Sequence, residues 1–294
     1  MTASLADLEA RVHHALASAD ESAIEVLGYG EISCVLAWHD GTEARAAKRL
    51  PLFDTEARVE AYEQAFDRYL EALSDAGLSV VPTRFETTPA ADGRIAAWCL
   101  QPMLDPDTLG PKWLQSADDD SARGLFDHLT EFIMAAVTPH TGLDGQLSNW
   151  AVVDDEFVYF DVTTPMLRDQ EGRETLDTEL FLASLPWALR GLVRRLFLHQ
   201  ILDTYYDPRE TLIDLLGNLI KEGLADRLAL GLERVNRHVT PAIDEGEVRR
   251  YYRQDAQMYA LIQRLRRIDR VWQRRVRCRP YPFLLPGRVE PVTY

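Results

Sequence analysis

Three oxygen-bearing side chains near the middle of the chain are spaced so that they could hold one metal ion. Asp144 and Asn149 lie in one polar loop, and Asp161 follows the next two apolar runs. These runs flank the acidic turn 154–156, a pattern that predicts a tight β-hairpin. A hairpin returns the end of its second strand to the start of its first, so Asn149 and Asp161 are expected to face one site. Their oxygens suit a hard cation such as Mg²⁺, and Asp144 adds a third polar group nearby.

Two glycines and a lysine nearer the N-terminus could bind phosphate. Gly28 and Gly30 fall at the first turn of three predicted antiparallel strands, and Lys48 lies on the third, after the hairpin signal Asp40-Gly41. Glycines let a backbone approach a phosphate closely, and a lysine offers it a compact positive charge. Lysine is also rare in this arginine-rich chain, so its position carries weight; the lysines are Lys48, Lys112 and Lys221. The three strands are expected at 23–27, 34–38 and 44–50.

The remaining pattern predicts a β-rich segment followed by a helical one. A long helix is expected from about Thr55 to Ala76, with apolar residues at spacings of three and four; Glu63 lies at the border of that buried face. Further strands are expected at 80–87 and 94–100. Beyond them the chain is mostly helical, with a polar loop at 168–173 and helices at 121–137, 178–198, 209–224, 225–238 and 245–274. An N-terminal helix at 4–18 should pack outside the body, and the apolar tail 280–286 should pack back onto it.

The order of these features resembles the protein-kinase-like superfamily. Proteins of that superfamily have the following features in this order: a glycine-rich loop, a third-strand lysine, a helix, a loop Asp, an Asn five residues later, and a second Asp after a strand pair. The resemblance covers about residues 24–161, with Ser33 at the position of the family's third glycine. The triplets His-Arg-Asp, Asp-Phe-Gly and Ala-Pro-Glu are absent, so the chain is more similar to the aminoglycoside and choline kinase branch. Even the usual His-Gly-Asp of that branch is replaced by Gly142-Leu143-Asp144.

The resemblance implies a bilobal α+β fold, with a small antiparallel-sheet lobe carrying one helix and a larger helical lobe. Its implied segments are an outer helix (1–23), the small lobe (24–103) and the large lobe (104–294). It implies ATP, or another nucleoside triphosphate, and Mg²⁺ as cofactors. The implied roles are Asn149 and Asp161 as metal ligands, Asp144 as the base that takes the acceptor's proton, and nucleotide contacts from Gly28, Gly30, Lys48, Glu63 paired with Lys48, and Met103 in the hinge 101–104.

Composition restricts the classes of partner and the compartment. The net charge of −15 argues against broad nucleic-acid binding. Three scattered cysteines, Cys34, Cys99 and Cys278, favour a reducing compartment, and the N-terminus lacks the pattern of a secretory signal. No apolar run is long enough to span a membrane. We therefore expect a cytoplasmic protein with neither nucleic acid nor membrane as partner; composition leaves the oligomeric state open.

Several functional alternatives stay open at this level. The first is phosphotransfer to a hydroxyl of a small molecule, for which an acidic chain favours a cationic amino sugar or amine; a Ser or Thr of a peptide is the other acceptor class. The second is a catalytically silent pseudokinase that acts as a scaffold through its arginine-rich last helix. The third is transfer of a nucleotidyl group. The arginines of that helix predict either a solvated face or a surface for an anionic partner.

Overall fold

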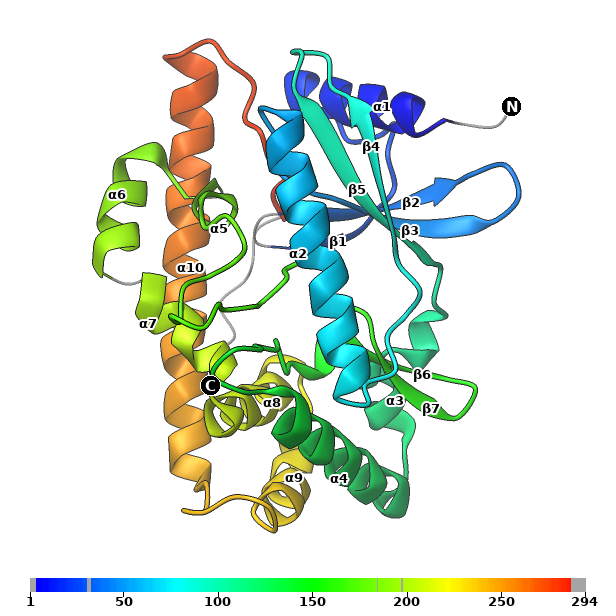
Figure 1. Cartoon of the computed structure of the whole chain (residues 1–294), viewed down its shortest axis with the longest axis vertical. Coiled ribbons are helices and arrows are strands. Elements are labelled where there is room, and N and C mark those ends of the chain that lie inside the picture. Colours follow the sequence, from blue (N-terminus) through cyan, green and yellow to red (C-terminus); the bar gives the residue numbers. More distant parts are fainter. Residues whose placement is uncertain (1–3, 31–32, 184, 197, 287–294) are drawn as a thin grey trace.

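The chain folds into two lobes, seen in a computed structural model that describes residues 4–30, 33–183, 185–196 and 198–286. In Figure 1 the main sheet lies at the upper right with α1 (Leu5–Ser18) and α2 (Glu56–Asp75). The helical lobe occupies the bottom and the left side, where α10 (Glu245–Arg275) runs nearly the full height, and the small hairpin β6–β7 (Trp150–Val153 and Glu156–Tyr159) lies below the sheet. The predicted α+β class and bilobal arrangement are confirmed. Residues 1–3 and 287–294 of the predicted first and last segments lie outside the described residues.

The sheet of the small lobe is antiparallel, with the strand order β1-β2-β3-β5-β4 within the described part of the chain. The β2–β3 hairpin closes where predicted, because Asp40 Oδ1 accepts hydrogen bonds from the backbone N–H groups of Thr42 and Glu43. Side chains of β2 alternate between buried and less buried positions, as expected for a strand with two unlike faces. The bounds are β1 Val26–Tyr29, β2 Cys34–His39, β3 Ala44–Arg49, β4 Arg84–Pro89 and β5 Ile95–Pro102.

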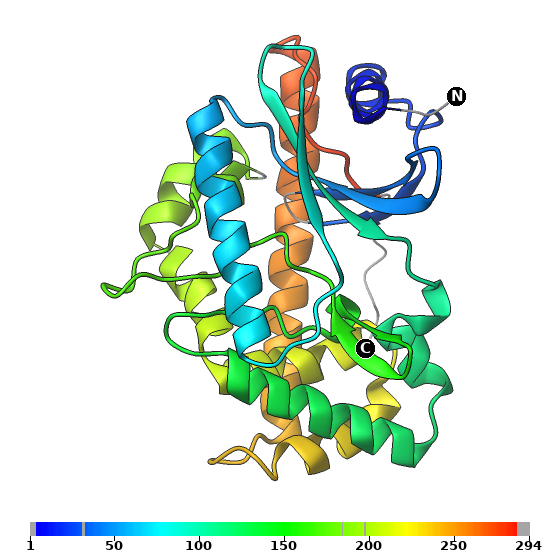
Figure 2. The same cartoon turned by 45° about the vertical axis from the view of Figure 1, so that its right-hand side comes forward.

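A helix covers each face of this sheet (Figures 1 and 2). Helix α1 (Leu5–Ser18) begins with a capping box between Ser4 and Asp7. It packs its apolar side on the face that carries Leu36 and Trp98. A buried, bidentate ion pair fastens it there: Arg49 Nε and Nη2 of β3 donate to the two Glu9 oxygens at 2.8 and 2.7 Å.

Helix α2 (Glu56–Asp75) covers the other face. Its N-cap is Thr55, whose side-chain oxygen accepts from the N–H of Arg58. The buried residues are those that the spacing predicted, with Ala65 in addition: Val59, Tyr62, Ala65, Phe66, Tyr69 and Leu73. The large lobe packs around α4 and α8 in the same continuous core, so α2 connects the two lobes.

The helical lobe is built around long helices that position the central hairpin. The hairpin turns through Asp154 and Asp155, both with positive φ (52° and 64°), which matches a two-residue turn. The tail packs back as expected, with Tyr281, Leu284 and Leu285 buried. The bounds are α3 Gly110–Ser116, α4 Asp119–Ala136, β6 Trp150–Val153, β7 Glu156–Tyr159, α5 Glu179–Ala183, α6 Trp187–Leu196, α7 Leu198–Asp203, α8 Pro208–Lys221, α9 Leu228–Val235 and α10 Glu245–Arg275, with 3₁₀ turns η1 Pro106–Thr108, η2 Leu147–Asn149, η3 Thr204–Tyr206 and η4 Ala225–Arg227.

Several predicted elements differ from those observed. The first strand, expected at 23–27, is β1 Val26–Tyr29 and includes Gly28, and the helix expected at 225–238 is the turn η4 followed by the shorter α9. The strand expected at 80–87 starts only at Arg84, because Val81 donates its N–H to Tyr159 O in the other lobe and Pro82 has no N–H to donate. The helix expected at 178–198 is divided into shorter ones, with Pro186 immediately before α6. Across the described segments, no helix has both the length and the apolar character that a membrane crossing requires.

Candidate active site

Lys48 and Asp161 meet between the two lobes. Lys48 Nζ on β3 donates to Asp161 Oδ1 at 2.6 Å, although the two residues lie 113 positions apart in the chain. Asp161 Oδ1 also accepts from Thr163 Oγ1 at 3.0 Å. The predicted approach of Lys48 to Asp161 is confirmed, and it brings the sheet of one lobe to the hairpin of the other.

The strand register places Gly28 in line with the lysine, although Gly28 lies within β1 and not in the turn predicted for it. Gly28 pairs with Val35, Val35 with Lys48, and Lys48 with Cys99, so these residues form one row across β1, β2, β3 and β5. Neighbouring strands lie about 4.8 Å apart, so Gly28 is about 10 Å from Lys48 along that row. Gly30 donates its N–H to Ser33 O at 3.0 Å and closes the turn; residues 31 and 32 of the predicted loop lie outside the described residues.

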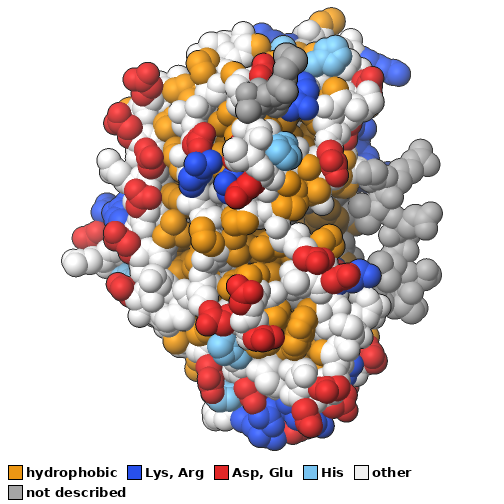
Figure 3. Space-filling view, turned by 90° about the vertical axis from the view of Figure 1, so that its right-hand side faces the viewer, with side chains coloured by type: hydrophobic (Ala, Val, Ile, Leu, Met, Phe, Trp, Pro, Cys, Tyr) orange, Lys and Arg blue, Asp and Glu red, His pale blue; other side chains and the backbone are white. Residues whose placement is uncertain are grey.

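The central hairpin brings Asn149 beside the residue that precedes Asp161. Trp150 pairs with Tyr159, and the N–H of Phe160 donates to Asn149 O at 3.0 Å. Gln101, near the end of β5, donates from Nε2 to Phe160 O at 2.7 Å and thereby attaches the predicted hinge to the residue before Asp161. Met103 follows β5 and is exposed. The face in Figure 3 shows a band of apolar side chains between the two lobes, with acidic side chains above and below it.

Asp144 is held in the loop by its backbone as much as by its carboxylate. Its carbonyl oxygen accepts from Asn149 Nδ2 at 3.2 Å and from Tyr159 Oη at 3.3 Å, and its Oδ1 accepts the N–H of Gln146 at 3.2 Å. Burial, and next the negative charge of Asp161, raise the pKa of Asp144 to about 6. Asp144 is therefore a better proton acceptor than an ordinary aspartate.

Asp161 has the opposite electrostatic setting. Burial opposes its ionisation, but the charge of Lys48 and the hydrogen bonds from Lys48 and Thr163 outweigh that effect and hold the pKa of Asp161 below its usual value. Two nearby carboxylates whose pKa values are moved apart suit two different jobs, a proton acceptor and a permanently charged ligand.

The expected pairing of Glu63 with Lys48 is wrong for this structure. Glu63 is exposed on α2, and Lys48 forms its ion pair with Asp161 instead. The reason is helical geometry: Tyr62 occupies the inward position, and the next residue is turned by about 100° toward solvent. Tyr62 Oη donates to Thr163 O at 2.9 Å, so a buried neutral hydrogen bond connects α2 to the segment after Asp161.

Residues from α8 and α10 form a further part of the site that sequence reasoning did not assign. Lys221 Nζ donates to Gln146 Oε1 at 3.1 Å, two residues after Asp144. Burial raises the pKa values of Asp144, Asp214 and Asp255, and the positive charge of Lys221 opposes part of that rise. Asp214 is buried and accepts from Tyr251 Oη at 3.0 Å; burial, followed by the charge of Asp144, raises its pKa to about 8. The rarity of lysine was the one signal that could have drawn attention to Lys221.

The donor atoms fit a magnesium ion held partly by water. Among the described residues there is no cluster of three or more His, Cys, Asp or Glu side chains that could hold a metal. Asn149 uses its amide nitrogen toward Asp144 O, which leaves the amide oxygen for a cation, and Asp161 contributes a carboxylate. Mg²⁺ usually keeps several waters and takes one or two carboxylates plus substrate phosphates, so this pair of oxygen ligands suffices.

The fold and the Lys48–Asp161 contact define a protein of the kinase-like class. A sheet lobe with α2, a helical lobe, and a third-strand lysine facing an aspartate after a hairpin are the arrangement of that superfamily. The chain belongs to the family described as "Family of unknown function (DUF6206)", whose model matches residues 7–270.

Among the solved structures that match this chain, two are similar over most of their length. No curated protein matches. One is WaaP in complex with acyl carrier protein, with 13% identity over 83% of this chain and 88% of that chain and a TM-score of 0.41. The other is a mutant form of the PknI kinase domain of Mycobacterium tuberculosis, with 14% identity over 82% of this chain and 85% of that chain and a TM-score of 0.34. Likeness at this level says nothing about substrate or activity.

Proposed function

We propose that the protein is a Mg²⁺- and ATP-dependent phosphotransferase of the small-molecule kinase type, acting on a hydroxyl group. The observation that carries the proposal is the meeting of Lys48 and Asp161 at 2.6 Å next to a second carboxylate, Asp144, whose pKa is raised. A positive group for phosphate, oxygen ligands for a cation and a proton acceptor are the parts that phosphoryl transfer requires.

Each residue then has a role that follows from its surroundings. Asp161 and Asn149 would hold Mg²⁺, which supplies positive charge to the nucleotide phosphates. Lys48 neutralises the same phosphates from the sheet, and the backbone at Gly28 in β1 and at Gly30 after it approaches them. Asp144 takes the proton of the acceptor hydroxyl. At the same time the hydroxyl oxygen forms a bond to the γ-phosphorus of ATP, and the bond between that phosphorus and the leaving ADP breaks.

The acceptor is a small molecule in this proposal, with a cationic group favoured. The positive charge of Lys221 acts on three acidic side chains: Asp144, Asp214 and Asp255. A protonated amine near a hydroxyl would match the negative charge of Asp144 and Asp161, whereas Asp214, with its pKa raised to about 8, keeps its proton at neutral pH. Transfer to a peptide Ser or Thr, or transfer of a nucleotidyl group, would show as a different product with the same nucleotide.

One observation favours the silent pseudokinase as the second candidate. The residue of α2 that faces the site is Tyr62 rather than an acidic one, and the ion pair of Lys48 is with Asp161. A protein that only binds nucleotide or a partner would tolerate this arrangement. The two candidates differ in one measurable outcome, the formation of a phosphorylated product.

Nucleotide binding is the first test of the proposal. Mg·ATP at about 100 times its dissociation constant should stabilise the protein by roughly 2.7 kcal/mol, seen as a higher melting temperature. Asp161→Asn should lose most of this stabilisation, because it removes a metal ligand. Asp154→Asn, in the exposed hairpin turn, is the matched control and should respond as the parent does. An unchanged melting curve of the parent at millimolar Mg·ATP would contradict nucleotide binding.

Lys221 is expected to assist the transfer from the acceptor side. Its ammonium bonds to Gln146 and lies within charge range of Asp144, so it can contact the transferring phosphate or an anionic group of the acceptor. Lys221→Met should lower kcat/KM by about 10- to 100-fold, the effect of one charged hydrogen bond. Lys221→Arg should restore part of it.

The control for Lys221 is the remaining lysine. Lys112 is an exposed residue of α3, and Lys112→Met should leave kcat/KM within twofold of the parent. Equal losses in the Lys221 and Lys112 variants, or a loss in Lys221→Met that Lys221→Arg fails to relieve, would remove Lys221 from the site.

A further inference from the structure

The C-terminal half of α10 exposes an unusual amount of apolar surface. Of the large apolar side chains that are exposed in the described residues, six lie on this helix or at its C-cap, and each is at least 45% exposed. They are Met258, Leu261, Ile268, Val271, Trp272 and Val276. A surface helix normally turns polar residues toward solvent, so this face is the reverse of the usual pattern.

The inward side of the same helix is correspondingly polar. Arg266 is 1% exposed and Gln263 is 4% exposed, whereas Ile268 is 59% exposed. The guanidinium of Arg266 lies 5.5 Å from the centre of the Phe283 ring, so the tail holds it inside. Packing of the tail therefore fixes which side of α10 faces outward, and that side is the apolar one.

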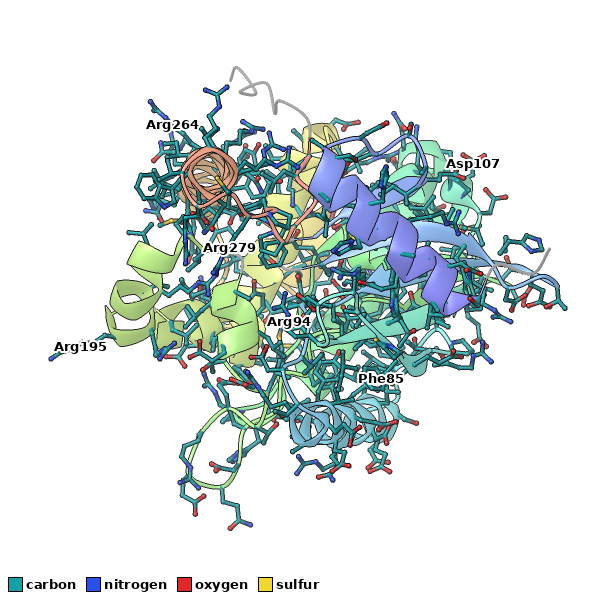
Figure 4. All side chains as sticks on the ribbon, turned by 90° about the horizontal axis from the view of Figure 1, so that it is seen from above. Phe85, Arg94, Asp107, Arg195, Arg264 and Arg279 are labelled. Atoms are coloured by element: carbon teal, nitrogen blue, oxygen red, sulfur yellow. The ribbon has the colours of Figure 1, made fainter. Side chains whose placement is uncertain are left out.

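The exposed apolar residues cover one broad side of the helix, and three of them lie along its middle. At about 100° per residue, Leu261, Ile268 and Trp272 point within about 40° of one another. Arg264 and Arg275 lie on the same outward side, and Figure 4 shows α10 at the edge of the molecule with Arg264 on its outer side. Both kinds of group share one open patch of this surface, formed by Arg264, Arg267, Ile268 and Val271.

The charge of this segment is opposite to that of the rest of the chain. Residues 261–279 contain eight arginines and one aspartate, a formal charge of +7 (8 − 1), although the whole chain carries −15. A matching partner must therefore be anionic as well as apolar. Two copies of this chain would bring two such cationic faces together, which disfavours pairing through α10.

We propose that the outward face of α10 lies on an anionic phospholipid surface. Apolar side chains with a Trp, mixed with arginines, are the composition of helices that lie in the plane of a membrane interface. Arginine stems can cover acyl chains while their guanidinium groups reach lipid phosphates, whereas a closed protein groove would have to provide a carboxylate for each arginine it buries. The proposal differs from the expectation, made from the sequence, that the protein has no membrane partner. That expectation rested on the lack of a membrane-spanning segment, and a helix that lies on the membrane surface does not need such a segment.

The test is sedimentation of the full-length protein with lipid vesicles. The protein should bind vesicles that contain about a third phosphatidylglycerol, bind pure phosphatidylcholine vesicles far less, and lose binding as salt rises. Ile268→Asp should weaken binding at least about tenfold, because it places a carboxylate against the lipid. Arg264→Glu should weaken it at least about fivefold. Both positions are on the surface, so the melting temperature should stay near that of the parent.

The matched control is Met134→Asp on α4, an apolar residue that is 42% exposed away from α10. It should bind vesicles as the parent does. As a second measurement, brominated lipid should quench tryptophan fluorescence less in Trp272→Phe than in the parent. Absence of binding at low salt, or equal binding by Ile268→Asp, would overturn the proposal. A dimer seen by light scattering and lost in Ile268→Asp would assign the face to a second copy, and binding to polyglutamate but not to vesicles would assign it to an acidic protein.

Discussion

Asp144→Asn is expected to reduce turnover by roughly 10²- to 10⁴-fold while leaving the affinity for Mg·ATP nearly unchanged. The carboxylate of Asp144 is placed to take the acceptor's proton, and its raised pKa of about 6 suits that task. The loop should survive the substitution, because the Asp144 carbonyl, not its side chain, accepts from Asn149 and Tyr159. Product formation with a panel of small alcohols and amino alcohols, and calorimetric ATP affinity, measure the two quantities.

The comparison variants separate the roles of the two carboxylates. Asp161→Asn should lose both Mg²⁺-dependent nucleotide binding and transfer, whereas Asp155→Asn in the exposed turn should lose neither. If Asp144→Asn loses nucleotide binding as badly as Asp161→Asn, the division of roles is wrong. A parent protein that binds Mg·ATP but phosphorylates neither alcohol nor water would favour the pseudokinase.

Glu9→Gln is expected to destabilise the fold by about 3–5 kcal/mol, because it leaves the Arg49 guanidinium buried without a counter-charge. The Arg49 and Glu9 side chains are 7% and 3% exposed, and two hydrogen bonds of 2.7 and 2.8 Å join them. The free energy of unfolding in urea is the measurement. Since the pair fastens α1 to β3, loss of α1 helicity should accompany the change.

A surface ion pair with the same substitution provides the control. Glu43, which is 68% exposed, pairs with Arg45, and Glu43→Gln should cost less than about 1 kcal/mol. Replacing both buried partners, as in Glu9→Leu with Arg49→Met, should recover much of the loss. A cost for Glu9→Gln as small as that for Glu43→Gln would mean that solvent reaches the pair.

Local spacing predicted the parts of the site that depend on one stretch of chain. The hairpin around Asp154 and the strand that carries Lys48 follow from alternation and turn residues, and the meeting of Lys48 with Asp161 followed from their order. The choice of Glu63 was wrong because a helical wheel locates the border of a face only to within about one residue.

Other parts depend on packing between distant segments. Lys221 and Asp214 reach the loop because α8 packs beneath it, which no local motif indicates. The outward side of α10 could not be read from its sequence either, since hydropathy would bury Ile268 and expose Arg266, and the structure does the reverse. That inversion depends on the returning tail, with Phe283 against Arg266.

The five residues 159–163 form the segment about which the two lobes can rotate. Four different parts of the small lobe are attached to this segment, by Val81 to Tyr159, Gln101 to Phe160, Lys48 to Asp161 and Tyr62 to Thr163, with distances of 2.9, 2.7, 2.6 and 2.9 Å. A rigid rotation of one lobe against the other can keep these bonds only if its axis passes close to the segment. Wide opening would have to break them together, so the lobes should open by pivoting about this segment, and Asp161 would keep its place throughout the motion.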